Sequence, residues 1–475
     1  MMRLLKVFFT VLLSICGLYS VAQTEQSASL EQQIDHEQLL AKLNTIRDRN
    51  NIAAVGLALV EGRKITYSGG LGTLSQHSDQ AITGATVFRL GSITKTFTAL
   101  AVLTLAQHQR VDLNAAIQQW IPKDWYQNPW QASHPITLAQ LLEHTAGFKD
   151  LSAAEFNFND DDFPPLRQTL QQFKHHHKVA WPPGQHTSYT NVGAGFVGFI
   201  IEQISGQPYE AFVVNKIAKP LGMTNTHFNV PGAERLAIGY DRDGKTPIPY
   251  WHTVYRSFGG INSTADDMGR FIQALIKAPE TSGKRPINHS MIQRMETPET
   301  SLAAQAGLRY GYGLGIYPWF NNGVLFYGHG GDADGYLSKM GYTRANDSGY
   351  FLVITAYNSW ALEKMQHLVE EYLTQNIQPP NPLKEYALNN QQIKNLVGTY
   401  QAVTNRFKAP RETMKIITDN NKYYTVIDNR KQQLIPVTAN TFRRKGETIA
   451  TSTLINIDND EQYFQEDRLN FKKLF

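Results

Sequence analysis

The sequence predicts an antiparallel sheet flanked by helices, a largely helical lobe, and a small all-β domain at the C-terminal end. Three observations support this fold class. Strand-like runs occur near residue 55 and again after residue 308, on either side of a stretch with mostly helical periodicity. A segment rich in proline and asparagine, 377–392, then precedes further short strand-like runs. The 475 residues are enough for about two or three domains.

Composition is that of a globular protein with a large core. Hydrophobic residues make up 42% of the chain and charged residues 18%, which argues against disorder. The formal net charge is +4, and the basic residues are scattered rather than gathered into a stripe or tail. We therefore expect no nucleic-acid partner.

The N-terminal residues, 1–22, have the pattern of a signal peptide. Arg3 and Lys6 precede an apolar run, and small residues, Ser20 and Ala22, follow at the expected cleavage site. This predicts export to the periplasm or secretion, without stable membrane insertion after cleavage. The alternative is an uncleaved anchor, although the run is short for a span of about 20 residues.

The only cysteine, Cys16, lies inside this segment. A lipoprotein would have a small residue before that cysteine, where this chain has Ile15. We therefore predict no lipidation. A cleaved chain has no cysteine, which excludes disulfides, a thiol nucleophile and a thiolate metal site.

The first predicted elements are a helix and a hairpin. Residues 30–50 form an amphipathic pattern, and two strand-like runs, 52–62 and 63–72, follow with a turn at Glu61-Gly62. Within the helical stretch, residues 191–205 read as a helix that stops at Gly206. A second helix, within the stretch 263–279, would be capped by Ser263 or Thr264.

After residue 308 the period changes to that of strands. Turn signals separate four runs and a helix closes the meander, which we place in one sheet with the early strands. The predicted strands are 310–320, 323–331, 334–344 and 349–359, the helix is 360–373, and the main domain is 30–376. The C-terminal β domain, 393–475, contains strand-like runs at 395–403, 421–430, 431–438 and 452–459.

Two polar clusters raise the question of a metal site. His175, His176 and His177 are adjacent, and so are the aspartates of 160–162. Adjacent side chains point in different directions on a regular element. We therefore interpret both clusters as surface loops and predict no metal site.

A serine and a lysine, Ser92 and Lys95, stand at the start of a long apolar run. On a helix, positions i and i+3 share one face. A serine hydroxyl needs a base beside it to act as a nucleophile, and a lysine becomes that base when burial lowers its pKa. Gly91 would let the backbone approach a substrate closely. A capped helix explains the same residues, so this pair alone leaves both interpretations open.

A second candidate stretch, "SYTN", precedes the predicted helix that begins near residue 191. In extended backbone, i and i+2 point the same way, so Tyr189 and Asn191 would face one cleft. A tyrosine can move a proton between nucleophile and leaving group, and an asparagine can hold the lysine and a substrate amide. The alternative is a buried tyrosine beside a helix cap.

A third candidate stretch, "HGGD", lies inside the strand meander. Gly330 and Gly331, which follow His329, would let a substrate lie along the strand. The backbone N–H of Asp332 would then join that of Ser92 in an oxyanion hole. A plain hairpin bend explains these glycines equally well.

Taken in order, these motifs resemble those of the serine β-lactamase and penicillin-binding-protein superfamily. The similarity is greatest to class C β-lactamases, D-amino-acid peptidases and esterases of that branch, and it runs over about 35–375. Further matching stretches are "LLEHTAGF", "PGQHTSYTN", "KPLGMTNTHF" and "GGINSTADDMGRF". The resemblance implies the family fold, an α/β lobe plus an all-α lobe, and an acyl-enzyme on Ser92. It also implies that the C-terminal domain is a small β-barrel.

One departure from the family pattern bears on substrate choice. The third motif of β-lactamases usually opens with lysine, whereas this chain has His329. A histidine with an ordinary pKa near 6.5 is largely neutral at pH 7, so it gives a substrate carboxylate no fixed charge. Some D-peptidases and esterases of the superfamily have similar motifs. The substitution therefore favours a peptidase or esterase over an efficient β-lactamase.

The main hypothesis is an exported serine hydrolase acting on ester, D-amino-acid peptide or amide, or β-lactam substrates, some of them cell-wall-derived. Ser92 is the nucleophile, Lys95 and Tyr189 exchange its proton, and which of the two is the base stays open. Asn191 and His329 position the substrate. No metal or organic cofactor is implied. The alternatives are a β-lactamase proper, or a penicillin-binding-type protein that binds without turnover.

Overall fold

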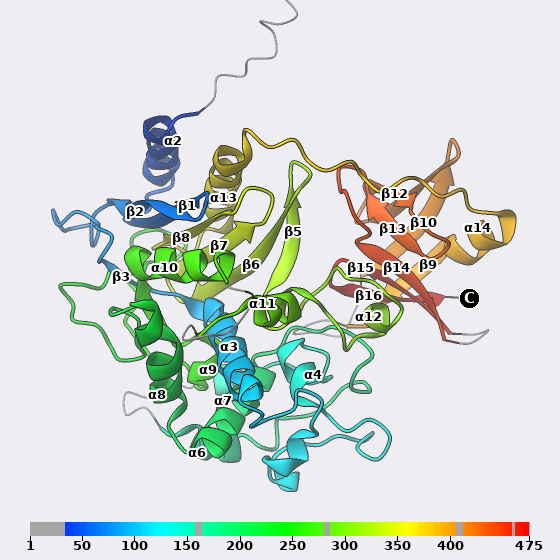
Figure 1. The fold of residues 1–475 in the computed structure, drawn as a ribbon, viewed down its shortest axis with the longest axis horizontal. Coiled ribbons are helices and arrows are strands. Elements are labelled where there is room, and N and C mark those ends of the chain that lie inside the picture. Colours follow the sequence, from blue (N-terminus) through cyan, green and yellow to red (C-terminus); the bar gives the residue numbers. More distant parts are fainter. Residues whose placement is uncertain are drawn as a thin grey trace, which may run out of the picture.

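The computed structural model describes residues 34–156, 164–278, 280, 286–404, 412–457 and 461–474. Two parts can be distinguished in Figure 1. The main domain, residues 34–376, combines a sheet with a helical lobe, and a barrel over residues 398–474 stands at its side. An extended segment, 377–389, joins the two and contains no helix or strand.

The sheet of the main domain joins strands from both ends of that domain. Its six antiparallel strands follow the order β2-β1-β8-β7-β6-β5, and Leu57 of β1 stands opposite Leu352 of β8. This confirms the prediction of one sheet from the early hairpin and the late meander. The strands are β1 Ala54–Glu61, β2 Lys64–Gly72, β5 Tyr317–Asn321, β6 Val324–Ala333, β7 Tyr336–Thr343 and β8 Ser348–Ile354.

The strand predicted over 310–320 begins only at Tyr317, so its first half is wrong. A tight turn precedes the strand, in which the N–H of Gly313 donates to the carbonyl of Ile316 at 3.0 Å. Gly315 has φ +68°, a left-handed conformation that interrupts a strand. The alternating buried tyrosines of this stretch give the sequence a strand-like pattern, although the backbone there is not a strand.

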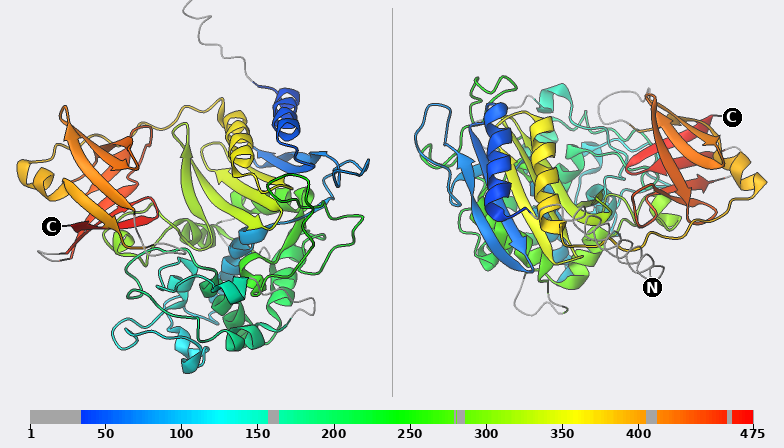
Figure 2. Two further views of the ribbon diagram at one scale, coloured as in Figure 1. Left: turned by 180° about the vertical axis from the view of Figure 1, so that it is seen from behind. Right: turned by 90° about the horizontal axis from the view of Figure 1, so that it is seen from above.

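Helices cover both faces of the sheet. Two terminal helices, α2 His36–Arg49 and α13 Ser359–Thr374, lie side by side on one face, as the view from above in Figure 2 shows. Helix α10, Ala265–Ile276, packs on the other face. Its N-cap is Thr264, whose side chain accepts from the N–H of Asp267, so the second of the two predicted caps is the one used. Residues 30–33 of the first predicted helix lie outside the described residues.

The helical lobe is built around α3, Thr94–Gln107, in which residues 94–105 are buried. Such all-round burial identifies a central core helix. Helix α7, Asn191–Ser205, ends at Gly206 with φ +71°, as predicted. The remaining elements of the main domain are short: β3 Val87–Arg89, α4 Leu138–Leu142, α5 Ala153–Phe156, α6 Leu166–Gln172, α8 Tyr209–Val213, α9 Arg256–Gly259, β4 Asn262–Thr264, α11 His289–Glu296 and α12 Leu302–Gln305.

The C-terminal domain is a closed eight-stranded barrel, which confirms the predicted small β domain. Closure comes from pairing of its last strand with its first, Phe471 opposite Ala402. Helix α14, Asn390–Leu396, precedes the strands β9 Gly398–Ala402, β10 Thr413–Asp419, β11 Lys422–Ile427, β12 Arg430–Pro436, β13 Thr441–Arg444, β14 Ser452–Asn456, β15 Gln462–Glu466 and β16 Leu469–Leu474. Four of these, β10, β13, β15 and β16, were not among the predicted strands.

The barrel contacts the main domain at the loop before α7. The carbonyl of Thr187 accepts from Asn470 Nδ2 at 3.1 Å and from Thr404 Oγ1 at 3.3 Å. Beside it, the rings of His186 and Tyr463 lie 4.9 Å apart between centroids. The barrel therefore holds the backbone that leads to Tyr189.

Among the helices of the described residues, none combines the length and apolar character needed to cross a bilayer. The predicted signal peptide, 1–22, lies outside the described residues. Export and cleavage therefore stay predictions.

Candidate active site

Ser92 stands on a 3-10 turn, η1 Gly91–Ile93, which runs directly into α3. Gly91 has φ +55°, and a Cβ at this position would lie 2.6 Å from the backbone N of Asp332. Both the backbone conformation and the available space therefore require glycine here. The close approach also brings the N–H of Asp332 next to the turn that carries Ser92.

Lys95 is buried on the first turn of α3, with 3% of its surface exposed. Its Nζ lies 3.1 Å from Ser92 Oγ, 2.7 Å from Asn191 Oδ1 and 3.0 Å from the carbonyl oxygen of Phe258. The i, i+3 spacing thus places the lysine beside the serine hydroxyl, as the sequence predicts. The three contacts come from three separate elements, η1, α7 and α9.

These three contacts of Lys95 Nζ differ in the hydrogen bonds that they can form. The oxygens of Asn191 and Phe258 only accept hydrogen bonds, whereas the hydroxyl of Ser92 both donates and accepts. A charged lysine satisfies all three with its N–H groups. A neutral lysine satisfies the same geometry by donating two N–H bonds and accepting the O–H of Ser92 on its lone pair. The site therefore supports both protonation states that a base must pass through.

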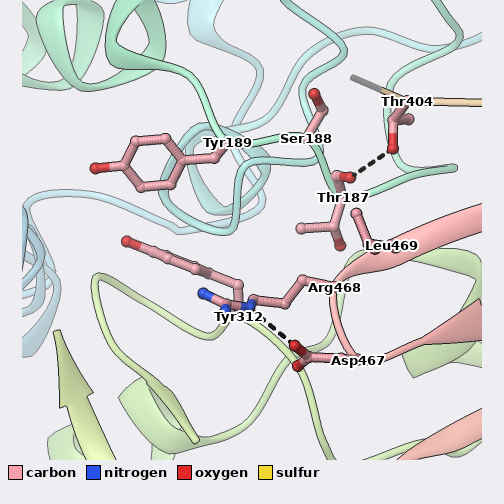
Figure 3. Close-up of a pocket in the computed structure, with 8 residues that line it drawn as sticks. All are labelled: Thr187, Ser188, Tyr189, Tyr312, Thr404, Asp467, Arg468 and Leu469. Atoms are coloured by element: carbon pink, nitrogen blue, oxygen red, sulfur yellow. Dashed lines mark hydrogen bonds and ion pairs between the residues drawn. The ribbon is translucent and has the colours of Figure 1, made fainter. Parts of the chain in front are cut away.

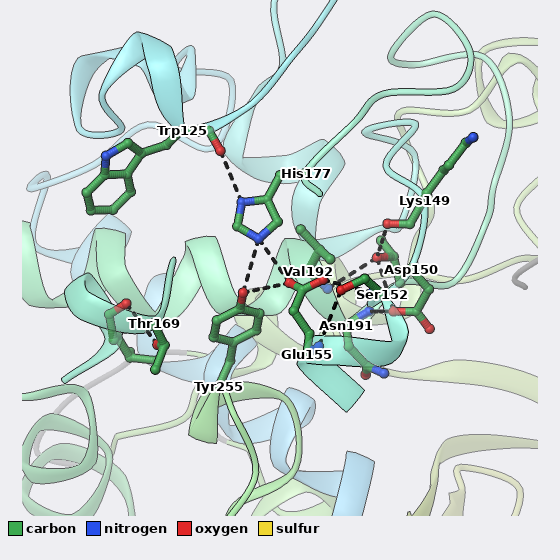
Figure 4. Close-up of polar contacts among 12 residues, drawn as sticks. Trp125, Lys149, Asp150, Ser152, Glu155, Thr169, His177, Asn191, Val192 and Tyr255 are labelled. Atoms are coloured by element: carbon green, nitrogen blue, oxygen red, sulfur yellow. Dashed lines mark hydrogen bonds and ion pairs between the residues drawn. The ribbon is translucent and has the colours of Figure 1, made fainter. Parts of the chain in front are cut away.

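The second motif is fixed by the start of α7. Asn191 is the first residue of that helix, and the side chain of Thr190 caps it by accepting from the N–H of Val192. The Asp150 carboxylate accepts from the N–H of Asn191 at 2.6 Å, as Figure 4 shows. Tyr189 is half-buried, with its ring centroid 4.8 Å from Lys95 Nζ. Tyr189 and Asn191 thus both face the lysine.

The third motif lies on β6, against the turn of Ser92. A Cβ on Gly331 would lie 1.9 Å from the carbonyl oxygen of Leu90 and 2.3 Å from Ser338 Oγ. Ser338 Oγ also donates to Leu90 O at 2.8 Å, which fixes the strands against the turn. Gly331 is therefore needed for close packing. Its predicted contact with substrate stays a prediction, as does the oxyanion role of Asp332 and Ser92.

His329 is buried with 3% of its surface exposed, and both of its ring nitrogens are engaged. Nδ1 contacts the carbonyl of Gly330 and Nε2 lies 2.7 Å from the hydroxyl of Tyr312. Since a carbonyl only accepts, Nδ1 carries the proton and Nε2 accepts from Tyr312. Burial, followed by the charge of Lys95, holds the pKa of His329 well below its ordinary value. The ring is therefore neutral, and its predicted contact with substrate stays a prediction.

Two cavities border these candidate residues. One of about 320 Å³ is lined by Ser92 and Asn191 together with the acidic Asp332 and Asp334. We call it the acidic cavity. The other, of about 370 Å³, is lined by Tyr189 and by residues of the barrel, including Arg468 (Figure 3). We call it the barrel cavity.

The histidine cluster differs from its predicted surface position in one residue. His175 and His176 are exposed, but His177 is fully buried. Its Nε2 lies 3.1 Å from Glu155 Oε1 and 3.0 Å from the hydroxyl of Tyr255, as Figure 4 shows. The buried carboxylate needs partners that compensate its lost hydration, which explains why this histidine turns inward. Aspartates 160–162 lie outside the described residues.

No group of three or more histidine, cysteine or acidic residues within the described ranges is arranged to hold a metal ion. Sequence reasoning missed four residues near the third motif: Tyr312, Tyr317, Lys339 and Arg468. On β7, Lys339 follows Ser338, whose side chain contacts Leu90, so Lys339 points to the opposite face of the sheet. Tyr312 lies before β5, and Tyr317 is the first residue of that strand. The dense run of aromatic residues at 310–320 could have indicated the two tyrosines, but no local signal points to Lys339 or Arg468.

A family model described as Beta-lactamase matches residues 37–373. Among curated relatives, Protein flp of Staphylococcus aureus is 24% identical over 328 residues, which are 67% of this chain and 63% of that protein. The chain thus spans less than two thirds of the length of that relative.

Solved structures show the same fold. The octameric penicillin-binding protein homologue from Pyrococcus abyssi has a TM-score of 0.60 at 21% identity, over 92% of this chain and 100% of its own. A D-amino acid amidase from Ochrobactrum anthropi has a TM-score of 0.58 at 23% identity, over 71% and 97% of the two chains. The first comparison extends across both the main domain and the barrel.

Proposed function

The chain belongs to the beta-lactamase family, and from that premise we propose that it is an exported serine hydrolase that acts through an acyl-enzyme on Ser92. A hydrolase with the serine β-lactamase fold is what the family and its neighbours support directly. The finer proposal is that its substrates are esters or D-amino-acid peptides and amides, and that it is not an efficient β-lactamase.

The observation that carries the proposal is the position of Lys95 Nζ, 3.1 Å from Ser92 Oγ. The oxygens of Asn191 and Phe258 accept from two N–H groups of Lys95, and in the neutral state we infer that its lone pair is directed at the serine hydroxyl. The base then removes the proton as Oγ bonds to the substrate carbonyl carbon. The backbone N–H groups of Ser92 and Asp332 would hold the negative oxygen that forms.

Tyr189 completes the proton path. Its ring lies over Lys95 Nζ and also forms part of the wall of the barrel cavity. As the carbonyl carbon loses its leaving group, Tyr189 delivers to that group the proton taken from Ser92. The leaving group therefore departs on the side of the barrel cavity. Water then hydrolyses the acyl-enzyme and restores the Ser92 hydroxyl.

The neutral state of His329 supports a peptidase or esterase. Its Nδ1–H donates to the carbonyl oxygen of Gly330, and its Nε2 lone pair accepts from the hydroxyl of Tyr312. Protonation of Nε2 would reverse the hydrogen bond with the Tyr312 hydroxyl and add a buried charge near Lys95. The histidine therefore cannot replace the fixed positive charge that the usual lysine of this motif would supply.

The test is turnover of nitrocefin, p-nitrophenyl butyrate and a D-amino-acid p-nitroanilide by the purified protein. Ser92→Ala serves as the blank, and intact-mass measurement detects the acyl-enzyme. Hydrolysis of the ester or the anilide with little nitrocefin turnover supports the proposal. Fast nitrocefin turnover contradicts the substrate preference, and a stable acyl-enzyme without turnover indicates a binding protein instead.

Export rests on the pattern of residues 1–22, with Arg3 and Lys6 before the apolar run. Intact-mass analysis of the full-length gene product, after fractionation of the producing cell, tests it. A mature chain that begins after Ala22 and leaves the cytoplasm supports export. A full-length chain in the cytoplasm contradicts it.

A further inference from the structure

The turn between β15 and β16 brings a cation from the barrel into the site. Asp467, with φ +54°, and Arg468 form this two-residue turn. They line the barrel cavity opposite Tyr189 and Tyr312 of the main domain. In Figure 3 the Arg468 side chain extends from the barrel toward Tyr312.

Arg468 is held in place by an aromatic ring rather than by strong ion pairs. Its guanidinium carbon lies 4.2 Å from the ring centroid of Tyr317, and its Nε lies 3.6 Å from Asp467 Oδ2. Side-chain exposure is 41%. Across the described residues the guanidinium has these two contacts, while an arginine offers five N–H donors. Donors thus remain available for an anionic ligand in the cavity.

A second cation reinforces the charge at this side of the site. Lys339 Nζ donates to the hydroxyl of Tyr317 at 3.2 Å and lies 3.8 Å from the ring centroid of Trp319. Within the described residues no carboxylate pairs with it. The acidic cavity on the other side of Ser92 is lined instead by Asp332 and Asp334. Acidic side chains therefore lie on one side of Ser92, and the basic side chains of Arg468 and Lys339 lie on the other.

We propose that Arg468 binds a carboxylate on the leaving group of the substrate, so that the enzyme prefers peptides or depsipeptides with a free terminal carboxylate. This rests on the proposed function, in which the leaving group departs past Tyr189 into the barrel cavity. A guanidinium matches a carboxylate with two parallel hydrogen bonds. The charge missing at His329 is thus supplied by a separate domain.

The chemistry at Ser92 does not consume this carboxylate. The bond from Ser92 Oγ to the acyl carbon forms and the bond from that carbon to the leaving nitrogen, oxygen or sulfur breaks. The proton released from Ser92 goes to the leaving atom through Lys95 and Tyr189. Arg468 is therefore a specificity-determining residue whose loss acts mainly on KM for carboxylated substrates.

The experiment compares two thioesters that share the same acyl group. The leaving group of the first is thioglycolate, and that of the second is the neutral amide of thioglycolate. We expect Arg468→Met to lower kcat/KM for the carboxylated thioester roughly 10- to 100-fold and to leave the neutral one within about 2-fold. Arg468→Lys should retain part of the preference for the carboxylated thioester, because lysine keeps the positive charge but cannot form two parallel hydrogen bonds with a carboxylate. Lys431→Met removes another cation of the barrel, which lies on β12 and is 40% exposed. This variant should leave kcat/KM unchanged for both thioesters.

A second readout separates this proposal from the proposed function. In Ser92→Ala, calorimetry measures the affinity for an uncleaved N-acyl dipeptide with a free carboxylate, with and without Arg468→Met. Weaker binding without Arg468 supports the proposal. Equal losses on both thioesters, or no loss on either, overturn it while Ser92-dependent turnover still upholds the proposed function. Absence of any acylation of Ser92 by the thioesters would overturn the proposed function itself.

Discussion

The site has two parts that are built in different ways. We call the part around Ser92, Lys95, Tyr189 and Asn191 the catalytic side, and the part around Arg468 the barrel side. Lys95 is buried, and its Nζ lies within 3.1 Å of polar atoms from three different elements of the core. Arg468 is 41% exposed and held by a ring contact and an ion pair of 3.6 Å. Under our two proposals, the bond-making chemistry is preorganised in the core, whereas Arg468 selects substrates at the junction between the domains.

The largest effect is expected where the catalytic side loses its nucleophile. Ser92→Ala should lower kcat roughly 10⁴-fold or more, because it removes the hydroxyl oxygen that is proposed to carry the acyl group, 3.1 Å from Lys95 Nζ. The thermal midpoint should change little, since only one oxygen is removed. Steady-state kinetics and scanning calorimetry measure the two effects. Ser359→Ala, exposed at the start of α13, is the control and should keep full activity.

A smaller loss is expected from Gly91→Ala. The added Cβ would lie 2.6 Å from the backbone N of Asp332, so the turn or β6 must move, and the proposed oxyanion donors move with it. We expect kcat to fall roughly 100-fold, the usual cost of losing one such donor. Kinetics on the ester substrate measures the loss.

Gly62→Ala is the matched control for that variant. Gly62 has φ +52° and nothing within 4 Å of an added Cβ, so it carries the same backbone strain without the clash. Gly62→Ala should lose about 1 kcal/mol of unfolding free energy from the left-handed backbone, Gly91→Ala should lose more because of the added clash, and only Gly91→Ala should lose activity. Equal activity in the two variants would show that the approach of Asp332 to Gly91 is not needed for catalysis.

Sequence reasoning found the catalytic side because its signals are local. Ser92 and Lys95 are one helical turn apart, and Tyr189 and Asn191 two residues apart, so spacing alone predicts that each pair shares a direction. The structure places all four together. The turn of His177 into the protein could not be predicted, because its cause is Glu155, whose burial depends on the tertiary fold.

The barrel side escaped prediction because its signals are not local. Arg468 stands between two strands that were not recognised, and its meeting with Tyr317 depends on how the closed barrel docks. Strand β16 contains two lysines within six residues, which masks its alternation. A charged residue in a hairpin turn is ordinarily a solvated one. Nothing in the sequence distinguishes this arginine from such a residue.

Mild acid should weaken the barrel side selectively. Burial, above all, lowers the pKa of His186 to about 4, and its ring packs on Tyr463 of the barrel. The unfolded chain binds a proton near pH 6.5 while the folded chain does not. This contribution to stability is therefore complete above about pH 6.5 and is lost as the pH falls toward 4.

The loss from His186 should reach at most about 3 kcal/mol of unfolding free energy. Urea unfolding at a series of pH values measures it. His186→Phe keeps an aromatic ring against Tyr463 but cannot titrate, so its stability should fall less between pH 6.5 and 4. An identical pH profile in the variant and the parent would remove His186 as the cause.

The smallest expected effect comes from the clamp between the barrel and the loop that carries Tyr189. Asn470→Ala removes the Nδ2 bond to the carbonyl of Thr187, while Thr404 Oγ1 still donates to the same oxygen. Since one acceptor bond remains, we expect a loss of about 1 kcal/mol in unfolding free energy. Urea unfolding measures it, and Gln432→Ala, exposed on β12, is the control that should lose less.

Activity in Asn470→Ala shows how far the two sides of the site are coupled. Tyr189 follows Thr187 by two residues, but the Asp150 carboxylate and the Thr190 cap independently fix the start of α7. The catalytic side should therefore keep kcat within about 3-fold, while KM for the carboxylated thioester rises because the turn of Arg468 loosens. A fall in kcat as large as that of Gly91→Ala would instead mean that the barrel positions Tyr189 for proton transfer, and that the two sides form one catalytic unit.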